Sequence, residues 1–179
     1  MHNMHVWYYN SLPPNKALQG TRKRWRAPEH GVRRQTTLPT CEGMHMKVTR
    51  ISIDPDPYEP FRLAQGYRAG DLLFISGQAA IDGSGQLVGL GNFDAQAEQV
   101  FANLERVLRA GGSSLVNVIK VTIFLRDMSN FAKIVELRGR YFTAPYPADT
   151  IVEVSSLYSP EALIEIEAIA VVDEAVDRT

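Results

Sequence analysis

Acidic side chains gather in the last predicted strands and are the best candidates for chemistry. Asp149 precedes a predicted strand over 150–156, and Glu165 and Glu167 alternate with isoleucine and alanine in a predicted strand over 163–172. A carboxylate between apolar neighbours is partly desolvated, which raises its pKa and suits general-base chemistry. Glu165 therefore fits either a group that positions water or a structural glutamate held by hydrogen bonds.

Histidine and cysteine are confined to the N-terminal part of the chain. All four histidines and the single cysteine precede Lys47. This distribution excludes Ser-His-Asp and Cys-His catalysis, and any ordinary zinc site, from residues 47–179. One cysteine forms no internal disulfide, which fits a reducing compartment. No apolar run reaches the roughly 20 residues of a membrane span. We therefore expect a cytoplasmic protein with no bound metal and no membrane contact.

The charge divides the chain into two parts. Residues 1–46 hold seven Lys or Arg against two Glu, whereas the remainder holds twelve basic and eighteen acidic residues. We expect 1–46 to be a disordered basic extension, possibly ahead of a native start at Met44 or Met46, and 47–179 to be one domain. The basic run 22–26 alternatively indicates a nucleic-acid patch. The acidic domain itself makes nucleic acid an unlikely partner.

Hydrophobic periodicity predicts an α+β domain in the order β-β-β-α-β-α-β-β, with both helices on one face of the sheet. One helix is expected to begin with Asp94 as its cap, and the other with Asp127 or Ser129. The second helix should bury one stripe, formed by Phe131, Ile134, Val135 and Phe142. The predicted strands span 48–53, 62–67, 72–78, 116–125, 150–156 and 163–172.

The sheet face without helices mixes carboxylates with isoleucine and valine. Such a face is too apolar for water and too charged for the core of a monomer. We therefore expect a neighbouring copy of the chain to cover it, in a homo-oligomer.

Several segments, in this order, resemble the reactive-intermediate deaminase (Rid, YjgF-like) superfamily. They are 72–78, 110–112, 118–127, 147–148, 152–154 and 164–170, and the match extends over about 47–173. The resemblance implies a chorismate-mutase-like fold with a mixed sheet and a homotrimer whose sheets form a central barrel. It also implies a small-molecule substrate bound at each subunit interface. Active members hydrolyse 2-imino or 2-enamino acids to 2-oxo acids and ammonia, without a metal or cofactor.

Three residues carry over from the resemblance to catalysis and binding. Glu165 matches the glutamate that orients the attacking water, and Ser76 and Gly77 match the strand that presents a hydroxyl and an N–H to the ligand. Tyr158 is a further candidate for the mouth of the pocket. Ser76 and Gly77 alternatively mark a tight strand end that accepts only small residues.

Four positions depart from the family pattern. The arginine that binds the substrate carboxylate is replaced by Asp149, a tyrosine by Leu63, an asparagine by Val135 and a cysteine by Ile151. An aspartate repels the carboxylate that a guanidinium binds with two charge-assisted hydrogen bonds. Asp149 is therefore expected either to cap a turn or to bind an amine. Arg62 and Arg138 are possible substitute cations.

The resulting prediction is an imine or enamine hydrolase acting on a substrate other than a simple 2-imino acid. The alternative is a trimer that binds a metabolite without catalysis. Ribonuclease or translation-inhibitor activity, a label that some members carry, fits an acidic domain poorly.

Overall fold

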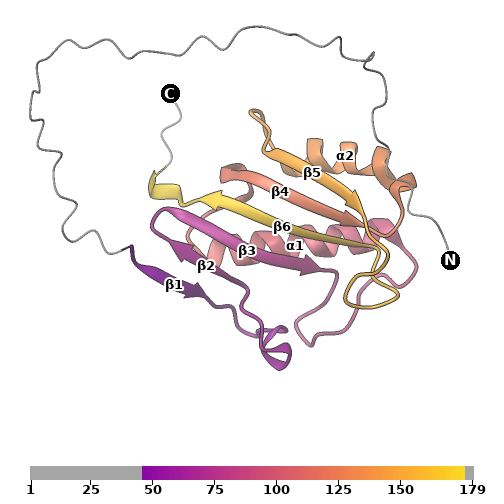
Figure 1. Ribbon diagram of the computed structural model, residues 1–179, viewed down its shortest axis with the longest axis horizontal. Helices are drawn as coiled ribbons and strands as arrows, with labels where there is room; N and C mark the ends of the chain where they lie inside the picture. Colours follow the sequence, from indigo (N-terminus) through magenta and orange to yellow (C-terminus); the bar gives the residue numbers. More distant parts are fainter. Residues whose placement is uncertain (1–45, 176–179) are drawn as a thin grey trace, which may run out of the picture. The chain divides into compact units, whose positions relative to one another are not determined.

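A six-stranded mixed sheet is the centre of the structure, a computed structural model that describes residues 46–175 (Figure 1). The predicted extension over 1–46 lies outside the described residues, apart from Met46. The sheet order is β1-β2-β3-β6-β4-β5, and only β4 and β5 are parallel. The strands are β1 Val48–Ile51, β2 Gly66–Ala69, β3 Leu72–Ala79, β4 Val118–Leu125, β5 Ala148–Glu153 and β6 Ile164–Val171.

Two helices, α1 Phe93–Ala110 and α2 Phe131–Tyr141, lie on the same side of this sheet (Figure 1). The sequence periodicity accounts for α1, whose large apolar residues recur every three to four positions and are buried. Beneath the helices, β6 contributes its even-numbered residues to the core, since strand side chains alternate between faces. The predicted α+β element order and the single helical layer are confirmed.

The helix starts differ from the prediction. Asn92, not Asp94, caps α1, because its side chain accepts hydrogen bonds from the backbone N–H groups of Asp94 and Ala95 at 3.1 and 3.2 Å. Asp127 caps only a short 3-10 turn that precedes α2, by accepting a hydrogen bond from the N–H of Ser129.

The stripe predicted for α2 is partly wrong. Ile134 and Phe142 are buried, but Phe131 and Val135 are exposed and Leu137 takes their place in the core. The reason is geometric, since the face of α2 that meets the sheet is narrower than the predicted stripe. Phe131 and Val135 therefore remain available at the surface.

The strand predicted over 62–67 is present as β2 but begins later than predicted. A 3-10 turn, Glu59–Phe61, ends just before this region, and Arg62 follows it in the left-handed conformation with φ of 59°. Such a backbone cannot continue an extended strand, so β2 begins only at Gly66.

The sheet face opposite the helices is open among the described residues. Tyr67, Leu72 and Phe74 are exposed there, and a hollow of about 300 Å³ is lined by Phe74, Ile75, Lys120, Thr122, Glu167, Ala168 and Ile169. This mixture of apolar and charged side chains agrees with the predicted composition of the face. Within residues 46–175, no helix has the length and apolar character to cross a membrane.

Candidate functional site

A β-bulge in β3 shapes the candidate site. Ile75 pairs with Ala168 of β6 and Gln78 pairs with Ile166, so that Ser76 and Gly77 together lie opposite Glu167. A bulge of this kind bends the strand and redirects side chains, and bulges are frequent beside active sites. The two residues that the sequence selected as ligand contacts are therefore the two residues of the bulge.

Glu165 of β6 lies directly against this bulge. A Cβ atom added to Gly77 would overlap Oε1 of Glu165, so only glycine leaves room for the carboxylate. Among the described residues, no group donates a hydrogen bond to the Glu165 carboxylate, and its oxygens are not sealed from solvent. Burial raises the pKa of Glu165 above its usual value, and the negative charge of Glu167 raises it further.

Aromatic and aliphatic side chains surround the carboxylate in a pocket of about 370 Å³, here called the Glu165 pocket. Its lining residues are Tyr58, Phe61, Leu63, Ser76, Gly77, Ala79, Ile81, Gly85, Tyr158 and Glu165. The structure thus brings together five of the predicted site residues, namely Leu63, Ser76, Gly77, Tyr158 and Glu165. An unpaired carboxylate in a largely apolar pocket is able to hold a water molecule and accept a proton from it.

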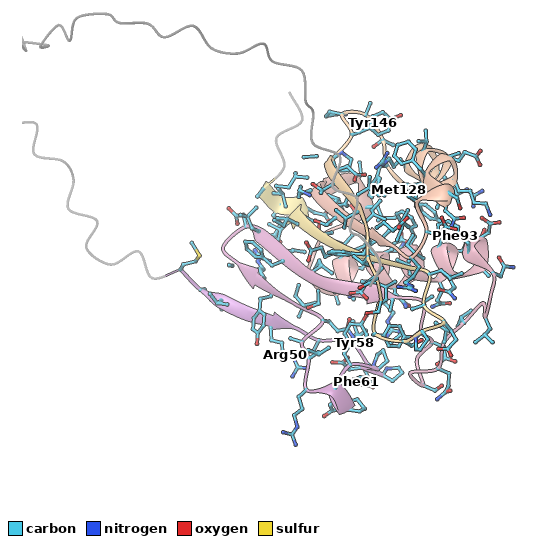
Figure 2. All side chains as sticks on the ribbon, turned by 45° about the vertical axis from the view of Figure 1, so that its right-hand side comes forward. Arg50, Tyr58, Phe61, Phe93, Met128 and Tyr146 are labelled. Atoms are coloured by element: carbon cyan, nitrogen blue, oxygen red, sulfur yellow. The ribbon has the colours of Figure 1, made fainter. Side chains whose placement is uncertain are left out.

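Asp149 lies elsewhere. Asp149 of β5 pairs with Val121 of β4, which is buried beneath the helices, so Asp149 lies on the helical face of the sheet. Glu165 lies on the opposite, open face. Asp149 and Val135 line a second pocket of about 530 Å³ together with Phe131, Arg138, Gly139 and Tyr146. Figure 2 shows the two places at opposite sides of the described domain, with Tyr58 and Phe61 at one side and Tyr146 at the other.

An ion pair occupies this second pocket. Nε of Arg138 donates a hydrogen bond of 2.6 Å to Oδ2 of Asp149, and both side chains are largely buried. The other oxygen, Oδ1, is buried and has no partner among the described residues. Arg138 also lies 5.8 Å from the centroid of the Phe131 ring, within cation–π range.

The structure corrects one interpretation of Asp149, because the residue lies within β5 and does not cap a turn. Binding of an amine by Asp149 stays a prediction, with Oδ2 already paired to the Arg138 guanidinium. Of the two possible substitute cations, Arg138 lies beside Asp149, whereas the exposed Arg62 lines neither of these two pockets. Ile151 packs against the hydrophobic core and lines neither of them either.

Tyr58 and Phe61 are pocket residues that the sequence did not indicate. Both lie in a proline-rich connection between β1 and β2, where no periodicity marks one residue above another. Tyr58 is buried, and desolvation raises the pKa of its phenol to about 12. In the part of the chain that the structure describes, no group of three His, Cys, Asp or Glu side chains is placed to hold a metal ion.

Comparison with known proteins gives concordant matches. The family model described as Endoribonuclease L-PSP matches residues 54–172. A RutC family protein of Pyrococcus horikoshii is 45% identical over 116 residues, which are 65% of this chain and 90% of that protein. A 2-iminobutanoate/2-iminopropanoate deaminase of Dermatophagoides farinae is 29% identical over 127 residues, 71% of this chain and 97% of that protein.

Solved structures agree with these sequence matches. The crystal structure of RidA from an Antarctic Psychrobacter species is similar with a TM-score of 0.64 and 34% identity. The match covers 69% of this chain and 99% of that structure. The likeness confirms the predicted fold class, with two helices on a mixed sheet. The chain belongs to the Endoribonuclease L-PSP family, and with it to the Rid/YjgF superfamily that its sequence motifs predicted.

Proposed function

We propose that this protein is a cofactor-independent imine or enamine hydrolase and that Glu165 is its catalytic residue. The observation that carries the proposal is the state of this carboxylate: desolvated, without a hydrogen-bond donor from the described residues, and facing a pocket. A carboxylate in a structural role is usually matched by donors, as Asp149 is by Arg138. The deaminase from Dermatophagoides farinae is a relative whose named activity is of this class.

The proposed reaction needs one water molecule and one base. Water held by Glu165 adds to the carbon of the C=N bond, and the carboxylate accepts the proton that the water loses. That proton passes to nitrogen and gives a carbinolamine. The hydroxyl of the carbinolamine then loses its proton through Glu165 to the same nitrogen as the C–N bond breaks, and the products are a carbonyl compound and ammonia. Because its pKa is raised, the Glu165 carboxylate is a stronger base than the carboxylate of an exposed glutamate.

The pocket residues define the substrate that fits. Phe61, Leu63 and Tyr158 supply an apolar wall, which favours an imine with an aliphatic or aromatic substituent. The resemblance places the carboxylate-binding arginine at Asp149, and an aspartate there gives no attraction to a carboxylate. We therefore propose a substrate other than a simple 2-imino acid.

The proposed functional unit is a homotrimer in which the second pocket, with Asp149 and Val135, faces the Glu165 pocket of a neighbour. Two features support this assembly. The open sheet face exposes Tyr67, Leu72 and Phe74, and the second pocket exposes Phe131 and Val135. Exposed apolar side chains in such numbers mark surfaces that bind a partner.

The test is a hydrolysis assay on imines without a carboxylate, generated in situ from 3-methylbutylamine and from ethylamine by a flavin amine oxidase, beside the 2-imino acid that an amino-acid oxidase makes from leucine. We expect wild type to accelerate carbonyl product formation above the spontaneous rate, with the 3-methylbutylamine-derived imine preferred over both others. Gly77→Ala should lower the rate by at least about 100-fold, because the new methyl group displaces the Glu165 carboxylate from its position. Ala102→Ser is the control, since it adds one heavy atom to an exposed residue of α1 that lines neither of the two pockets.

A second candidate is a trimer that binds a metabolite without turning it over. The observation that favours it is the largely apolar lining of the Glu165 pocket, with Leu63 where the resemblance places a tyrosine. It predicts no acceleration for any imine, together with a raised melting temperature in the presence of 3-methylbutanamide, a neutral analogue of the 3-methylbutylamine-derived imine. Acceleration that Gly77→Ala abolishes excludes it.

A further inference from the structure

Tyr58 connects the proline-rich loop before β2 to the bulge of β3. Its hydroxyl donates a hydrogen bond of 2.7 Å to the carbonyl oxygen of Gly77 and accepts one of 3.1 Å from the N–H of Ala79. One phenolic group therefore satisfies a backbone acceptor and a backbone donor on either side of Gln78. Only 7% of the Tyr58 surface is exposed, although the ring also forms part of the pocket wall.

A bulge needs such partners, because its extra residue has no place in the hydrogen-bond ladder with the next strand. Side chains and loop backbone supply the remaining contacts here. Nε2 of Gln78 donates to the carbonyl of Ser76 at 3.0 Å, and the N–H of Ser76 donates to the carbonyl of Gln65 at 3.0 Å. The hydroxyl of Tyr58 is the group that holds the Gly77 side of the bulge.

Tyr58 is itself held firmly. Its N–H donates to Oδ1 of Asp56 at 3.0 Å, and the same oxygen accepts a hydrogen bond of 2.7 Å from Nε2 of Gln65. Its carbonyl accepts hydrogen bonds from the N–H groups of Phe61 and Leu63 at 3.1 and 3.3 Å. The ring therefore reaches the bulge from a loop that is fixed by its own hydrogen bonds.

We propose that Tyr58 is the positioning residue of the site, whose hydroxyl fixes the Gly77 peptide so that Glu165 and its water face the substrate in one geometry. The inference rests on the proposed function for its catalytic consequence. The Glu165 carboxylate lies where a Cβ atom of residue 77 would be, so we expect a shift of this peptide to move the carboxylate. A displacement of a catalytic group by about 1 Å is enough to slow a reaction by up to roughly 100-fold. The raised phenol pKa keeps the hydroxyl a donor throughout the neutral range.

The decisive variant is Tyr58→Phe, which keeps the ring and removes only the hydroxyl. The matched control is Ser113→Ala, which removes another buried hydroxyl, the donor of a 2.6 Å hydrogen bond to the carbonyl of Val171 at the far end of β6. Tyr58→Phe loses two hydrogen bonds to backbone and Ser113→Ala loses one, so a general loss of stability affects both. Only Tyr58→Phe releases the bulge.

Three measurements on the full chain distinguish a positioning role of Tyr58 from a purely structural one: enzyme kinetics, hydrogen exchange of the Ala79 amide and titration of Glu165. We expect Tyr58→Phe to lower kcat for the 3-methylbutylamine-derived imine at least about tenfold with KM within about twofold of wild type. By NMR, the Ala79 amide should exchange its hydrogen at least about tenfold faster, and the carboxyl of Glu165 should titrate at a lower pKa as water enters. Ser113→Ala should leave kcat, KM, the exchange rate and the pKa of Glu165 unchanged.

Turnover of Tyr58→Phe within about twofold of wild type, or an equal loss in both variants, overturns the proposal. A higher KM at unchanged kcat also overturns it, because that result assigns Tyr58 to binding alone. If wild type turns over no imine, the proposed function fails instead. The exchange of the Ala79 amide and the titration of Glu165 then decide the positioning role, and values equal to wild type contradict it.

Discussion

At the residue scale, two carboxylates with opposite environments define the chemistry of this protein. Glu165 is desolvated and has no donor among the described residues, so it is able to act on a bound water. Asp149 instead forms an ion pair with Arg138. The difference follows from the strand geometry, because β5 turns Asp149 to the helical side of the sheet and β6 turns Glu165 to the open side.

The buried charge of Glu165 should make stability depend on pH. Its folded-state pKa lies above the unfolded value, so the favourable contribution is fully present below the unfolded pKa and is lost as pH rises through the folded pKa. Among the titratable neighbours, Glu167 disfavours a negative charge on Glu165, whereas Glu165 itself raises the pKa of Tyr58 and Tyr158. Glu165→Gln should therefore melt at a higher temperature than wild type at pH 8, with the gap closing towards pH 4. If the difference in melting temperature between Glu165→Gln and wild type instead grows towards acidic pH, burial does not raise the pKa of Glu165.

The Arg138–Asp149 pair should contribute measurably to stability. Arg138→Met keeps the aliphatic stem but leaves a largely buried carboxylate unmatched, at a cost of about 2 kcal/mol in the free energy of unfolding. Arg140→Met removes an exposed pair with Glu98 and should cost less than about 0.5 kcal/mol. Urea denaturation measures both.

A second substitution completes this test. Adding Asp149→Asn to the Arg138→Met variant removes the unmatched charge and should restore part of the loss. Equal stability of Arg138→Met and Arg140→Met would show that Asp149 does not depend on its partner.

At the element scale, helix α1 should depend on its observed cap. Asn92→Ala removes the acceptor of two backbone hydrogen bonds and should lower the free energy of unfolding by about 1 kcal/mol. Asp94→Ala removes only an exposed ion pair with Lys133 and a favourable helix-dipole contact, so its effect should be less than half as large. The reverse ranking in thermal or urea unfolding would restore Asp94 as the cap.

The elements themselves were predictable from periodicity, but their ends were not. Alternation along 163–172 correctly predicted which residues of β6 enter the core, because burial on one face leaves a period of two in the sequence. Asn92 and Asp94 are both good caps, and only the backbone decides between them. The left-handed turn at Arg62 was invisible, since arginine carries no preference for that conformation.

Only part of the candidate site was predictable from the sequence. The motif around Ser76 and Gly77 and the glutamate of β6 led to one pocket, as the structure shows. The separation of Asp149 from that pocket was not foreseen, because closeness in sequence does not reveal which sheet face a strand residue occupies. Tyr58 was missed because its role comes from contacts across 19 and 21 residues of chain.

At the scale of the whole molecule, the open sheet face should join copies of the chain. Phe74 is exposed among apolar neighbours on this face, and placing a charge there should prevent association. Wild type should have a mass in solution three times that of the 20.0 kDa chain, and Phe74→Glu should lower it. Leu90→Glu changes an equally apolar, exposed loop residue off the sheet and should leave the mass unchanged. Light scattering coupled to gel filtration measures this, and a monomeric wild type would contradict the trimer.

The measurement that tests the central claim most directly compares imine hydrolysis by wild type, Glu165→Gln and Glu167→Gln. Glu167 is the matched control, a glutamate two residues along the same face of β6 and outside the Glu165 pocket. We predict that Glu165→Gln loses at least about 100-fold in turnover while remaining at least as stable as wild type at neutral pH, because the amide no longer accepts the proton of the attacking water. Glu167→Gln should stay within about threefold of wild type. Equal turnover by wild type and Glu165→Gln would contradict the account.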